Sequence, residues 1–431
     1  MRRLLIVSPA FPPTNAADLH RVRASLPHYS EFGWEPSVLA IRPEEMESPE
    51  QDPLLAETVP AGIEVRRVGA LPRRHAQRFG LGSAGLRALP FLCRAGSRWV
   101  RELRPDLVYF STTQFPVTII GPYWQSRFGV PFVVDMQDPW VTGMRSVVPE
   151  QRSGWKHRLM RTLHGALEPR VMCRAGGLVS VSQGFVDALR DRYPALRRRP
   201  AKVVRFAVAE ADFKVLETHP QPNRFFQLGD GHVHGVYVGR GGHNLARSLR
   251  LFFKAWRAGL AANPALFGKV RLHFVGTDYA PAGRGKRTVA PVAAEFGLED
   301  RVQEEPDRQP YFTALQVMKA ADFLVVPGSE EPEYAASKLC GCVLARRPLL
   351  ATFHEQSNAV SLLRATRAGD VVTFGAAPDG AGQVVALQAA WHRLLERLPA
   401  APATNWPAFE AYSARSATRE QCAVFDEVLG A

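Results

Sequence analysis

The run ADFLVVP at residues 321–327 and the segment YAASK at residues 334–338 indicate how this chain folds. The first is short, apolar and rich in β-branched residues, and it ends at a proline and a glycine, which is typical of a buried strand. From Lys338 onward apolar residues recur at helical spacing, and Ser337 is a natural helix N-cap. The sequence therefore predicts a strand followed by a helix at this place.

The same alternation of strand and helix runs along the whole chain. Strands are expected at Leu4–Val7, Pro36–Ile41, Ile63–Val68, Asp106–Ser111, Pro131–Asp135, Gly177–Ser182, Lys202–Val208, His234–Arg240, Val270–Gly276, Phe323–Val326, Pro348–Phe353 and Asp370–Phe374. Helices are expected at Arg21–Phe32 after a capping Asp18, at Pro116–Phe128, at Gln183–Tyr193 and from Asn244 onward, and a linker at Glu217–Gly231. This pattern predicts an α/β protein with two tandem doubly wound Rossmann-like domains. Ligands of such sheets bind at the carboxyl ends of the strands, here in a cleft between the domains.

Length, charge and cysteine content narrow the class of protein. A chain of 431 residues exceeds one ordinary domain. The net charge of +13 calls for an acidic partner, either a nucleotide phosphate, nucleic acid or an anionic membrane surface. Basic residues are not interleaved with aromatic ones as in single-strand binders, so we expect a membrane surface and no nucleic acid. The stretch Leu86–Leu92, apolar among arginines, is either an interfacial membrane patch or a helix packed on its own core.

The five cysteines and the lack of long apolar runs point to a location. An odd number of cysteines without framework spacing is typical of a reducing compartment. The sequence has no apolar run of about twenty residues, the length that a spanning helix needs. We therefore expect a cytoplasmic protein that lies, at most, on the inner face of a membrane.

Two glycine- or lysine-containing turns predict a diphosphate site in the second half. In VGRGGHN at residues 238–244, Arg240 ends a strand, Gly239 and Gly241 let backbone approach a ligand, and His243 and Asn244 begin a helix. Lys338 stands at a helix start, where a cation is favoured only if an anion shares the site. The alternatives are a tight turn that needs glycine and a solvated surface lysine. Gly276 and Thr277 end a third strand, where they either face a base or ribose or form a plain strand terminus.

Acidic and amide side chains follow strands of the first half. Asn15 and Asp18 come after the first strand, and Asp135 and Asp138 end a later one. An acidic pair there would orient or deprotonate a sugar hydroxyl. The alternatives are a helix-capping Asp18 and a turn-forming Asp138 before proline. The sequence has no GxSxG, HExxH or P-loop pattern, which argues against serine hydrolases, zinc proteases and P-loop enzymes.

With these motifs the chain resembles GT-B glycosyltransferases of the family 4-like group. The resemblance covers nearly the whole chain and rests on LIVSPAFPP at 5–13 with Arg21, on 135–140, on VSVS at 179–182, on VGR at 238–240, and on SKL at 337–339 leading to RPLL at 347–350. It implies an acceptor-side domain over residues 1–220, a nucleotide-sugar domain over residues 221–405 and a C-terminal helix over residues 406–431 that packs back on the first domain. The chain departs from the family at two positions, Gly341 in place of the second of two paired glutamates and Leu245 in place of a lysine.

The resemblance also implies an activity. Similar enzymes transfer a sugar from a nucleotide diphosphate sugar, usually with retention and without a metal or other cofactor, and here to a polysaccharide or lipid-linked acceptor. Arg240, Ser337 and Lys338 would neutralise the leaving diphosphate. The resemblance further implies catalytic Asp138 and Glu333, donor contacts from Glu331 and Tyr334 beside those named above, and acceptor-side Asn15, Asp18, Arg21 and Asp135. A nucleotide-sugar 2-epimerase and a non-catalytic GT-B-like binding or scaffold protein are the alternatives.

Overall fold

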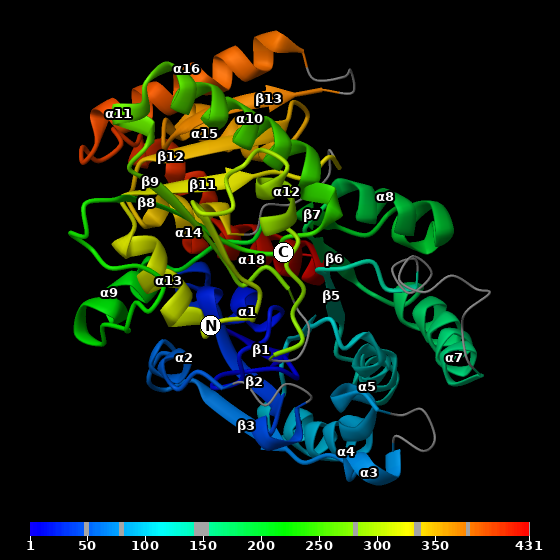
Figure 1. The fold of residues 1–431 in the computed structure, drawn as a ribbon. Coiled ribbons are helices and arrows are strands. Elements are labelled where there is room, and N and C mark those ends of the chain that lie inside the picture. The colour runs from blue at the N-terminus through cyan, green and yellow to red at the C-terminus, as the bar shows by residue number, and fades with distance from the viewer. Residues whose placement is uncertain are drawn as a thin grey trace. The chain divides into compact units, whose positions relative to one another are not determined.

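The computed structural model describes residues 1–46, 51–76, 82–141, 155–278, 283–331, 338–375 and 380–430. The chain divides into two compact units, one of residues 1–207 with 413–431 and one of residues 208–412 (Figure 1). The first boundary comes before the expected residue 220, and the last comes after the expected residue 405.

Unit 1 is built on a seven-stranded parallel sheet in the order β3-β2-β1-β4-β5-β6-β7. Its strands are β1 (Arg2–Val7), β2 (Trp34–Ile41), β3 (Glu64–Val68), β4 (Leu107–Ser111), β5 (Phe132–Met136), β6 (Gly177–Ser180) and β7 (Ala201–Val203). Its α-helices are α1 (Leu19–Ser25), α2 (Leu54–Glu57), α3 (Arg73–Ala76), α4 (Ala84–Leu103), α5 (Ile120–Phe128), α7 (Trp155–Met172), α8 (Gln183–Arg192) and α18 (Ala414–Leu429). Short 3-10 turns are η1 (Tyr29–Phe32), η2 (Pro43–Glu45), η4 (Phe115–Ile119) and η6 (Pro194–Leu196).

Both faces of this sheet are buried. Along β1, Leu5 and Val7 belong to one apolar core, which α4, α5 and α7 cover, while Leu4 and Ile6 belong to the other. Strand residues point alternately to the two faces, so a strand that is covered on both sides reads as a continuous apolar run. This explains why the strands were readily predicted from the sequence.

The C-terminal helix α18 belongs to unit 1, although it follows unit 2 in the chain. Its Phe425 packs in the second core, with its ring centroid 5.0 Å from that of Tyr109. Gln421 accepts a hydrogen bond from the Tyr29 hydroxyl at 2.9 Å, and Asp426 pairs with Arg2 at 2.7 Å. In Figure 1 this red helix lies beside the blue α1, and the two are in contact.

Unit 2 is built on a six-stranded parallel sheet in the order β10-β9-β8-β11-β12-β13. Its strands are β8 (Val233–Val238), β9 (Val270–Val275), β10 (Val302–Glu305), β11 (Phe323–Pro327), β12 (Leu349–His354) and β13 (Asp370–Phe374). Its α-helices are α9 (Glu210–Thr218), α10 (Ala246–Ala262), α11 (Pro264–Phe267), α12 (Ala290–Ala294), α13 (Tyr311–Ala320), α14 (Leu339–Leu344), α15 (Asn358–Thr366), α16 (Ala381–Arg397) and α17 (Trp406–Phe409). The 3-10 turns are η7 (His243–Leu245) and η8 (Glu410–Tyr412).

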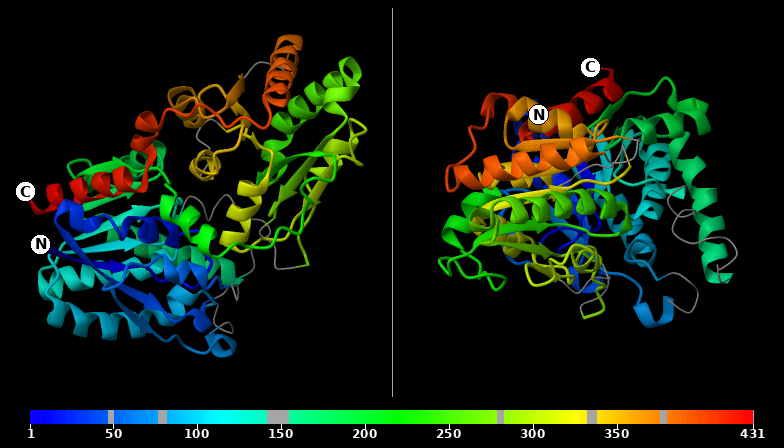
Figure 2. Two further views of the ribbon diagram at one scale, coloured as in Figure 1. Left: turned by 90° about the vertical axis from the view of Figure 1, so that its left-hand side faces the viewer. Right: turned by 45° about the horizontal axis from the view of Figure 1, so that its top comes forward.

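Aromatic packing joins the helices of unit 2 to its sheet. Figure 2 shows α10 and α16 side by side, and Trp256 of α10 stacks on Trp391 of α16 with 5.9 Å between ring centroids. Phe323 of β11 meets the same Trp391 edge-on at 5.5 Å. The predicted fold class, two doubly wound α/β domains, is therefore confirmed. No helix of the described residues has the length and apolarity to cross a membrane.

Some sequence-based expectations about elements are wrong in detail, and the strand expected over Lys202–Val208 already ends at Val203. The helix expected over residues 21–32 ends at Ser25, because Pro27 has no N–H to continue it, and a separate 3-10 turn follows. The helix expected from Asn244 begins at Ala246, after a 3-10 turn. Strand β10 was not predicted, because its sequence VQEE carries three polar residues, although Glu304 is buried.

A hydrogen-bonded pair of histidines joins the neighbouring strands β8 and β9 of unit 2. The His234 and His273 side chains approach at 3.0 Å between Nδ1 and Nε2, and His234 Nε2 lies 3.1 Å from an Asp230 carboxylate oxygen. His273 Nδ1 contacts the Gln303 side chain at 3.1 Å, and the Phe226 ring stacks on His234. Burial, together with the neighbouring His234, lowers the pKa of His273 to about 4.

We predict that the stability of the protein falls as the pH drops from about 6.5 to about 4. In this window the unfolded chain binds a proton at His273 and the folded chain does not, so acid favours unfolding. His273→Gln keeps a donor and an acceptor but cannot titrate, and should remove about 3 kcal/mol of this pH dependence in urea unfolding curves. His392→Gln, at an exposed position of α16, is the control. Equal pH dependence in wild type and His273→Gln would contradict the assignment.

Candidate functional site

The loops at the carboxyl ends of β8 and β11 lie where the strand order of unit 2 reverses. From β8 the chain continues outward to β9 and β10, and then returns to β11 on the other side of β8. Such a switch point is where doubly wound sheets bind ligands. The predicted donor residues 239–244 follow β8, and Glu331 follows β11.

Hydrogen bonds join these two loops. The Glu330 N–H donates to the Asn244 carbonyl at 3.0 Å. The hydroxyl of Ser248 in α10 donates to the Gly328 carbonyl at 2.7 Å and is buried. The Asn244 amide contacts the Ser329 hydroxyl at 3.4 Å. The structure therefore joins the loop of the predicted residues 239–244 to the beginning of the loop after β11.

The glycines after β8 shape the loop by their size and backbone conformation. Gly242 has a φ of +120°, which disfavours other residues, and its N–H donates to the Thr288 hydroxyl at 3.0 Å. A Cβ on Gly241 would come within 2.4 Å of the same hydroxyl, and the Gly241 N–H donates to the Thr277 carbonyl at 2.8 Å. These N–H groups are thus bonded within the protein, as in the tight-turn alternative. Arg240 and His243 are the exposed residues of the loop.

Glu304 of β10 anchors the neighbouring loop after β9. Its buried carboxylate accepts hydrogen bonds from the Thr277 hydroxyl at 2.6 Å and from the N–H groups of residues 288, 289 and 290 at 2.8–2.9 Å. Thr277 is consequently buried, and Gly276 turns the chain with a φ of +71°. Sequence reasoning missed Glu304. The available signal was its position two residues after Val302 on a short strand, which places both side chains on the same face of the sheet.

The other predicted donor residues are placed as follows. Glu331 is exposed, and its N–H donates to the Ser329 hydroxyl at 3.1 Å. Lys338 is exposed and directly precedes α14, while Glu333, Tyr334 and Ser337 lie outside the described residues.

The two departures from the family pattern fall on buried positions. A Cβ on Gly341 in α14 would lie 3.7 Å from Met318 and Val208, so a side chain there would meet apolar groups. Leu245 is also buried, at 1% exposure. Both positions are buried, so a charged side chain there would lose its hydration.

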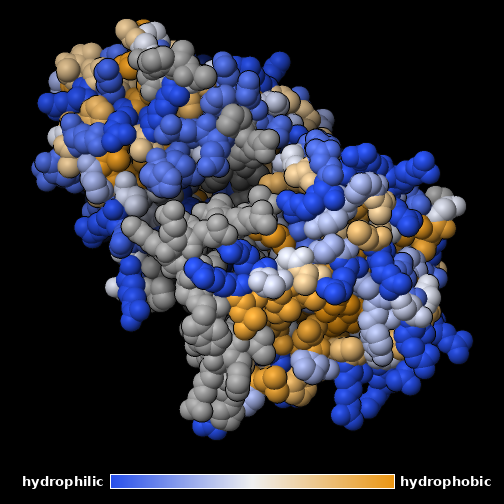
Figure 3. Space-filling model, turned by 90° about the vertical axis from the view of Figure 1, so that its right-hand side faces the viewer, coloured by the Kyte–Doolittle hydropathy of each residue, from blue (hydrophilic) through white to orange (hydrophobic). Residues whose placement is uncertain are grey.

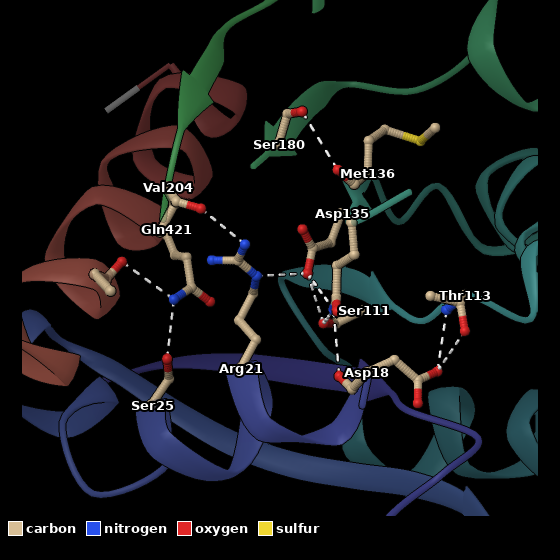
Figure 4. A network of polar contacts seen from close by, with 12 residues as sticks. Asp18, Arg21, Ser25, Ser111, Thr113, Asp135, Met136, Ser180, Val204 and Gln421 are labelled. Atoms are coloured by element: carbon tan, nitrogen blue, oxygen red, sulfur yellow. Dashed lines mark hydrogen bonds and ion pairs between the residues drawn. The ribbon is translucent and has the colours of Figure 1, made fainter. Parts of the chain in front are cut away.

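In unit 1 a buried ion pair lies beneath the carboxyl ends of the central strands (Figure 4). Arg21 Nε of α1 is 2.9 Å from an Asp135 carboxylate oxygen of β5, and both side chains are buried. The same oxygen accepts hydrogen bonds from the Ser111 hydroxyl and the Gln137 amide, each at 2.8 Å. Arg21 also donates to the Val204 carbonyl at 2.8 Å. Arg21 and Asp135 were predicted on the acceptor side. Because both are buried, they would act on an acceptor only by holding Ser111, Gln137 and Val204 in position.

Gln137 connects this ion pair to Asp18. Its amide donates to the Asp18 carbonyl at 3.3 Å as well as to Asp135. Sequence reasoning missed Gln137, although it stands between two predicted residues in DMQDPW. Asn15 is buried in the same loop as Asp18.

Asp18 precedes α1 but does not cap it. Its carboxylate instead accepts from the Thr113 N–H at 3.0 Å and from the Thr112 and Thr113 hydroxyls at 3.2 Å, so the capping alternative is wrong. Burial raises the pKa of Asp18, and the bonds from Thr113 and Thr112 partly oppose this shift.

Asp138 is the exposed acid of the loop after β5. Although its side chain reaches solvent, partial desolvation of the carboxyl group raises the pKa of Asp138, and the Asp18 carboxylate raises it further. Two residues on, Trp140 is buried, stacks on Phe115 and donates its Nε1–H to His164 Nδ1 of α7 at 2.8 Å. Burial lowers the pKa of His164, which keeps that nitrogen free to accept. Trp140 thus anchors the loop to α7, whereas Asp138 on the same loop is exposed.

The family resemblance of the sequence also implies an activity that needs no metal ion. Within the described ranges, no three or more histidines, cysteines or acidic residues are grouped so that they could hold a metal ion.

Comparison with known proteins matches part of the chain to a family model and nearly all of it to solved structures. Residues 20–208 match the family model of the glycosyl transferase 4-like domain. No curated protein matches the sequence of the chain.

Solved structures match over nearly the full length. A trehalose-6-phosphate protein from E. coli bound with UDP-2-fluoro glucose has a TM-score of 0.61 at 12% identity, covering 100% of this chain and 99% of that one. Sucrose-phosphate synthase from Thermosynechococcus elongatus has a TM-score of 0.55 at 13% identity, with 100% of both chains covered. WaaG, a glycosyltransferase of lipopolysaccharide biosynthesis, has a TM-score of 0.52 at 14% identity, with 99% and 100% covered. The resemblance stated from the sequence is confirmed.

Removing the charge of Asp135 should destabilise the protein far more than removing a surface charge. Asp135→Asn leaves the Arg21 guanidinium buried without its counter-ion, which costs about 3–5 kcal/mol of unfolding free energy. Adding Arg21→Met should recover most of this loss. Glu102→Gln, which breaks the exposed pair with Arg66, is the control and should cost less than about 1 kcal/mol. Urea unfolding of the wild type and the three variants measures these values, and equal losses for Asp135→Asn and Glu102→Gln would contradict the role of the ion pair.

Proposed function

Because the chain has the GT-B fold and residues 20–208 match the glycosyl transferase 4-like domain, we propose that it is a metal-independent, retaining glycosyltransferase. Its donor is a nucleotide diphosphate sugar, and its acceptor is a polysaccharide or a lipid-linked saccharide. The observation that carries the proposal is the pair of hydrogen-bonded loops after β8 and β11, at the switch point of unit 2.

These loops are suited to a charged ligand because hydrogen bonds hold them to each other and because they carry exposed cations. Glu304 fixes the loop after β9, and Ser248 and Asn244 fix the loops after β11 and β8. Groups that are held in place before the ligand arrives need little reorganisation when charge develops on it. Arg240 supplies a guanidinium that can bind two phosphate oxygens, and Lys338 supplies a second positive charge.

The chemistry follows from this charge. In the transfer, the bond between the anomeric carbon and the diphosphate oxygen breaks, and the acceptor hydroxyl oxygen bonds to that carbon. Negative charge then develops on the leaving diphosphate, where Arg240, Lys338 and Ser337 would stabilise it. Glu331 and Glu333 would hold hydroxyls of the donor sugar.

Unit 1 would bind the acceptor through the loop that ends β5. Asp138 is its exposed carboxylate, and its raised pKa suits a group that orients an acceptor hydroxyl or takes its proton. Asn15 and Asp18 would complete the pocket. Asp135 and Arg21 would set the position of this loop through Gln137.

Two further features bear on the proposal. None of the five cysteines forms a disulfide, which supports a location in the reducing cytoplasm. The buried Gly341 and Leu245 favour a second candidate, a protein that binds nucleotide sugars without transferring them.

We expect a nucleoside diphosphate to raise the melting temperature of the protein whether or not magnesium is present. Arg240→Ala and Lys338→Ala should each weaken its binding by about tenfold or more, since each removes a charge-assisted contact. Arg393→Ala is the matched control, because it removes an arginine of unit 2 that pairs with Asp370 at the start of β13. Unchanged affinity in both test variants would refute the donor site. Conversion of a nucleotide sugar without an acceptor would indicate an epimerase.

Asp138→Asn should lower kcat by about a hundredfold or more and leave donor affinity unchanged. In the wild type, activity should be lost as the pH falls through the pKa of Asp138, which lies above that of an ordinary aspartate. This acid limb should vanish in Asp138→Asn. Binding without turnover in the wild type, with every acceptor offered, would instead support the second candidate.

A further inference from the structure

One side of unit 1 carries large apolar side chains on the outside of three neighbouring helices. Figure 3 looks onto the side on which α5 and α7 lie and shows a hydrophobic patch bordered by hydrophilic residues. Phe91 of α4, Tyr123 of α5 and Leu159 of α7 are 41%, 47% and 47% exposed. They are three of the seven large apolar residues that are exposed in the described part of the chain.

The three helices are neighbours in one layer that covers the same apolar core, and each of them exposes one of these side chains. α5 contacts both α4 and α7. The close approach of α4 and α5 is possible because Gly96 lies against Trp124, where a Cβ would come within 2.4 Å of the ring. α7 is tied to α5 by Arg174, which donates to the Ser126 hydroxyl at 2.6 Å. Half-buried aliphatic residues fill in the surface: Leu89, Ile119, Met160 and Leu163.

The charges around this surface have one sign. Among the side chains of these helices that the structure describes, the exposed basic ones are Arg94, Arg98, Arg101, Arg127, Arg158 and Arg170. The helices contain two acidic residues, and neither opposes them. Glu102 pairs with Arg66, and Glu168 is buried, where it accepts hydrogen bonds from Arg192 and Tyr193.

We propose that this surface, the outer side of α4, α5 and α7, docks the protein on a bilayer that contains anionic phospholipids. Apolar side chains bordered by arginines have the composition of an interfacial surface, in which rings enter the headgroup region and guanidinium groups meet lipid phosphates. Each arginine near such a surface is attracted to it, and the attraction weakens with salt. This docking is independent of the transferase activity proposed above.

Two other occupants fit the observations less well. A nucleic acid would use the arginines, but it gives no reason for a large apolar side chain on the outside of each helix. A second copy of the chain would place like-charged arginines against one another across a two-fold axis. An anionic bilayer satisfies both the apolar and the basic component.

Co-sedimentation of the full chain with phosphatidylcholine vesicles, with and without phosphatidylglycerol, tests the proposal. We expect binding to the anionic vesicles that weakens as salt is raised. Arg94→Ser with Arg98→Ser should weaken it by about fivefold for each arginine removed. Tyr123→Ser with Leu159→Ser should abolish the binding that persists at high salt. Urea unfolding verifies that both double variants fold.

Matched controls distinguish an effect of this surface on vesicle binding from an effect of the net charge of the protein. Lys254→Ser with Arg257→Ser removes the same charge from exposed positions of α10, and Val385→Ser removes an exposed apolar residue of α16. Both should bind the vesicles like the wild type. The proposal is overturned if the controls lose as much affinity as the test variants, or if anionic vesicles are not bound. Self-association of the protein through the tested residues would assign the surface to a second copy of the chain. Displacement from vesicles by RNA that carries as many charges as the lipid would assign it to a nucleic acid.

Discussion

The buried ion pair between Arg21 and Asp135 is the interaction on which the functional side of unit 1 depends. It joins α1 to β5, and through Ser111 and Val204 it reaches the ends of β4 and β7. Two charges inside a protein are stable only when each is paired and hydrogen-bonded, so the geometry of all these segments is specified together. A shift of one loop would leave a charge without its partner.

Glu304 has the corresponding task in unit 2. A single carboxylate there holds the Thr277 hydroxyl and three consecutive N–H groups at the start of α12. In both units a buried acid thus anchors the loops at the carboxyl ends of the strands. The buried charges fix the loops, whereas Asp138, Arg240 and Lys338 are exposed.

This division explains which motif residues are structural. Gly241 and Gly242 are needed because the turn leaves no room for a Cβ and requires a positive φ, and their N–H groups bond within the protein. Gly341 lies among apolar side chains, so the position that carries a glutamate in similar enzymes belongs to the core here. The N–H groups of Gly241 and Gly242 are therefore occupied within the turn, and Arg240 and His243 are its exposed residues.

The sequence by itself determined the fold class, because strands covered on both faces must be continuously apolar and the helices between them must alternate with them. It also located the turns after β8 and β11, since glycine, proline and capping residues mark the ends of elements. It did not reveal β10, Glu304 or Gln137, because a buried polar residue has the same letter as an exposed one and is recognised only by its partners. Only the tertiary structure decided that Asp135 and Arg21 face each other, that Asp138 faces solvent, and that three helices distant in sequence share one apolar, basic surface. Each of these depends on contacts between segments that local sequence patterns do not encode.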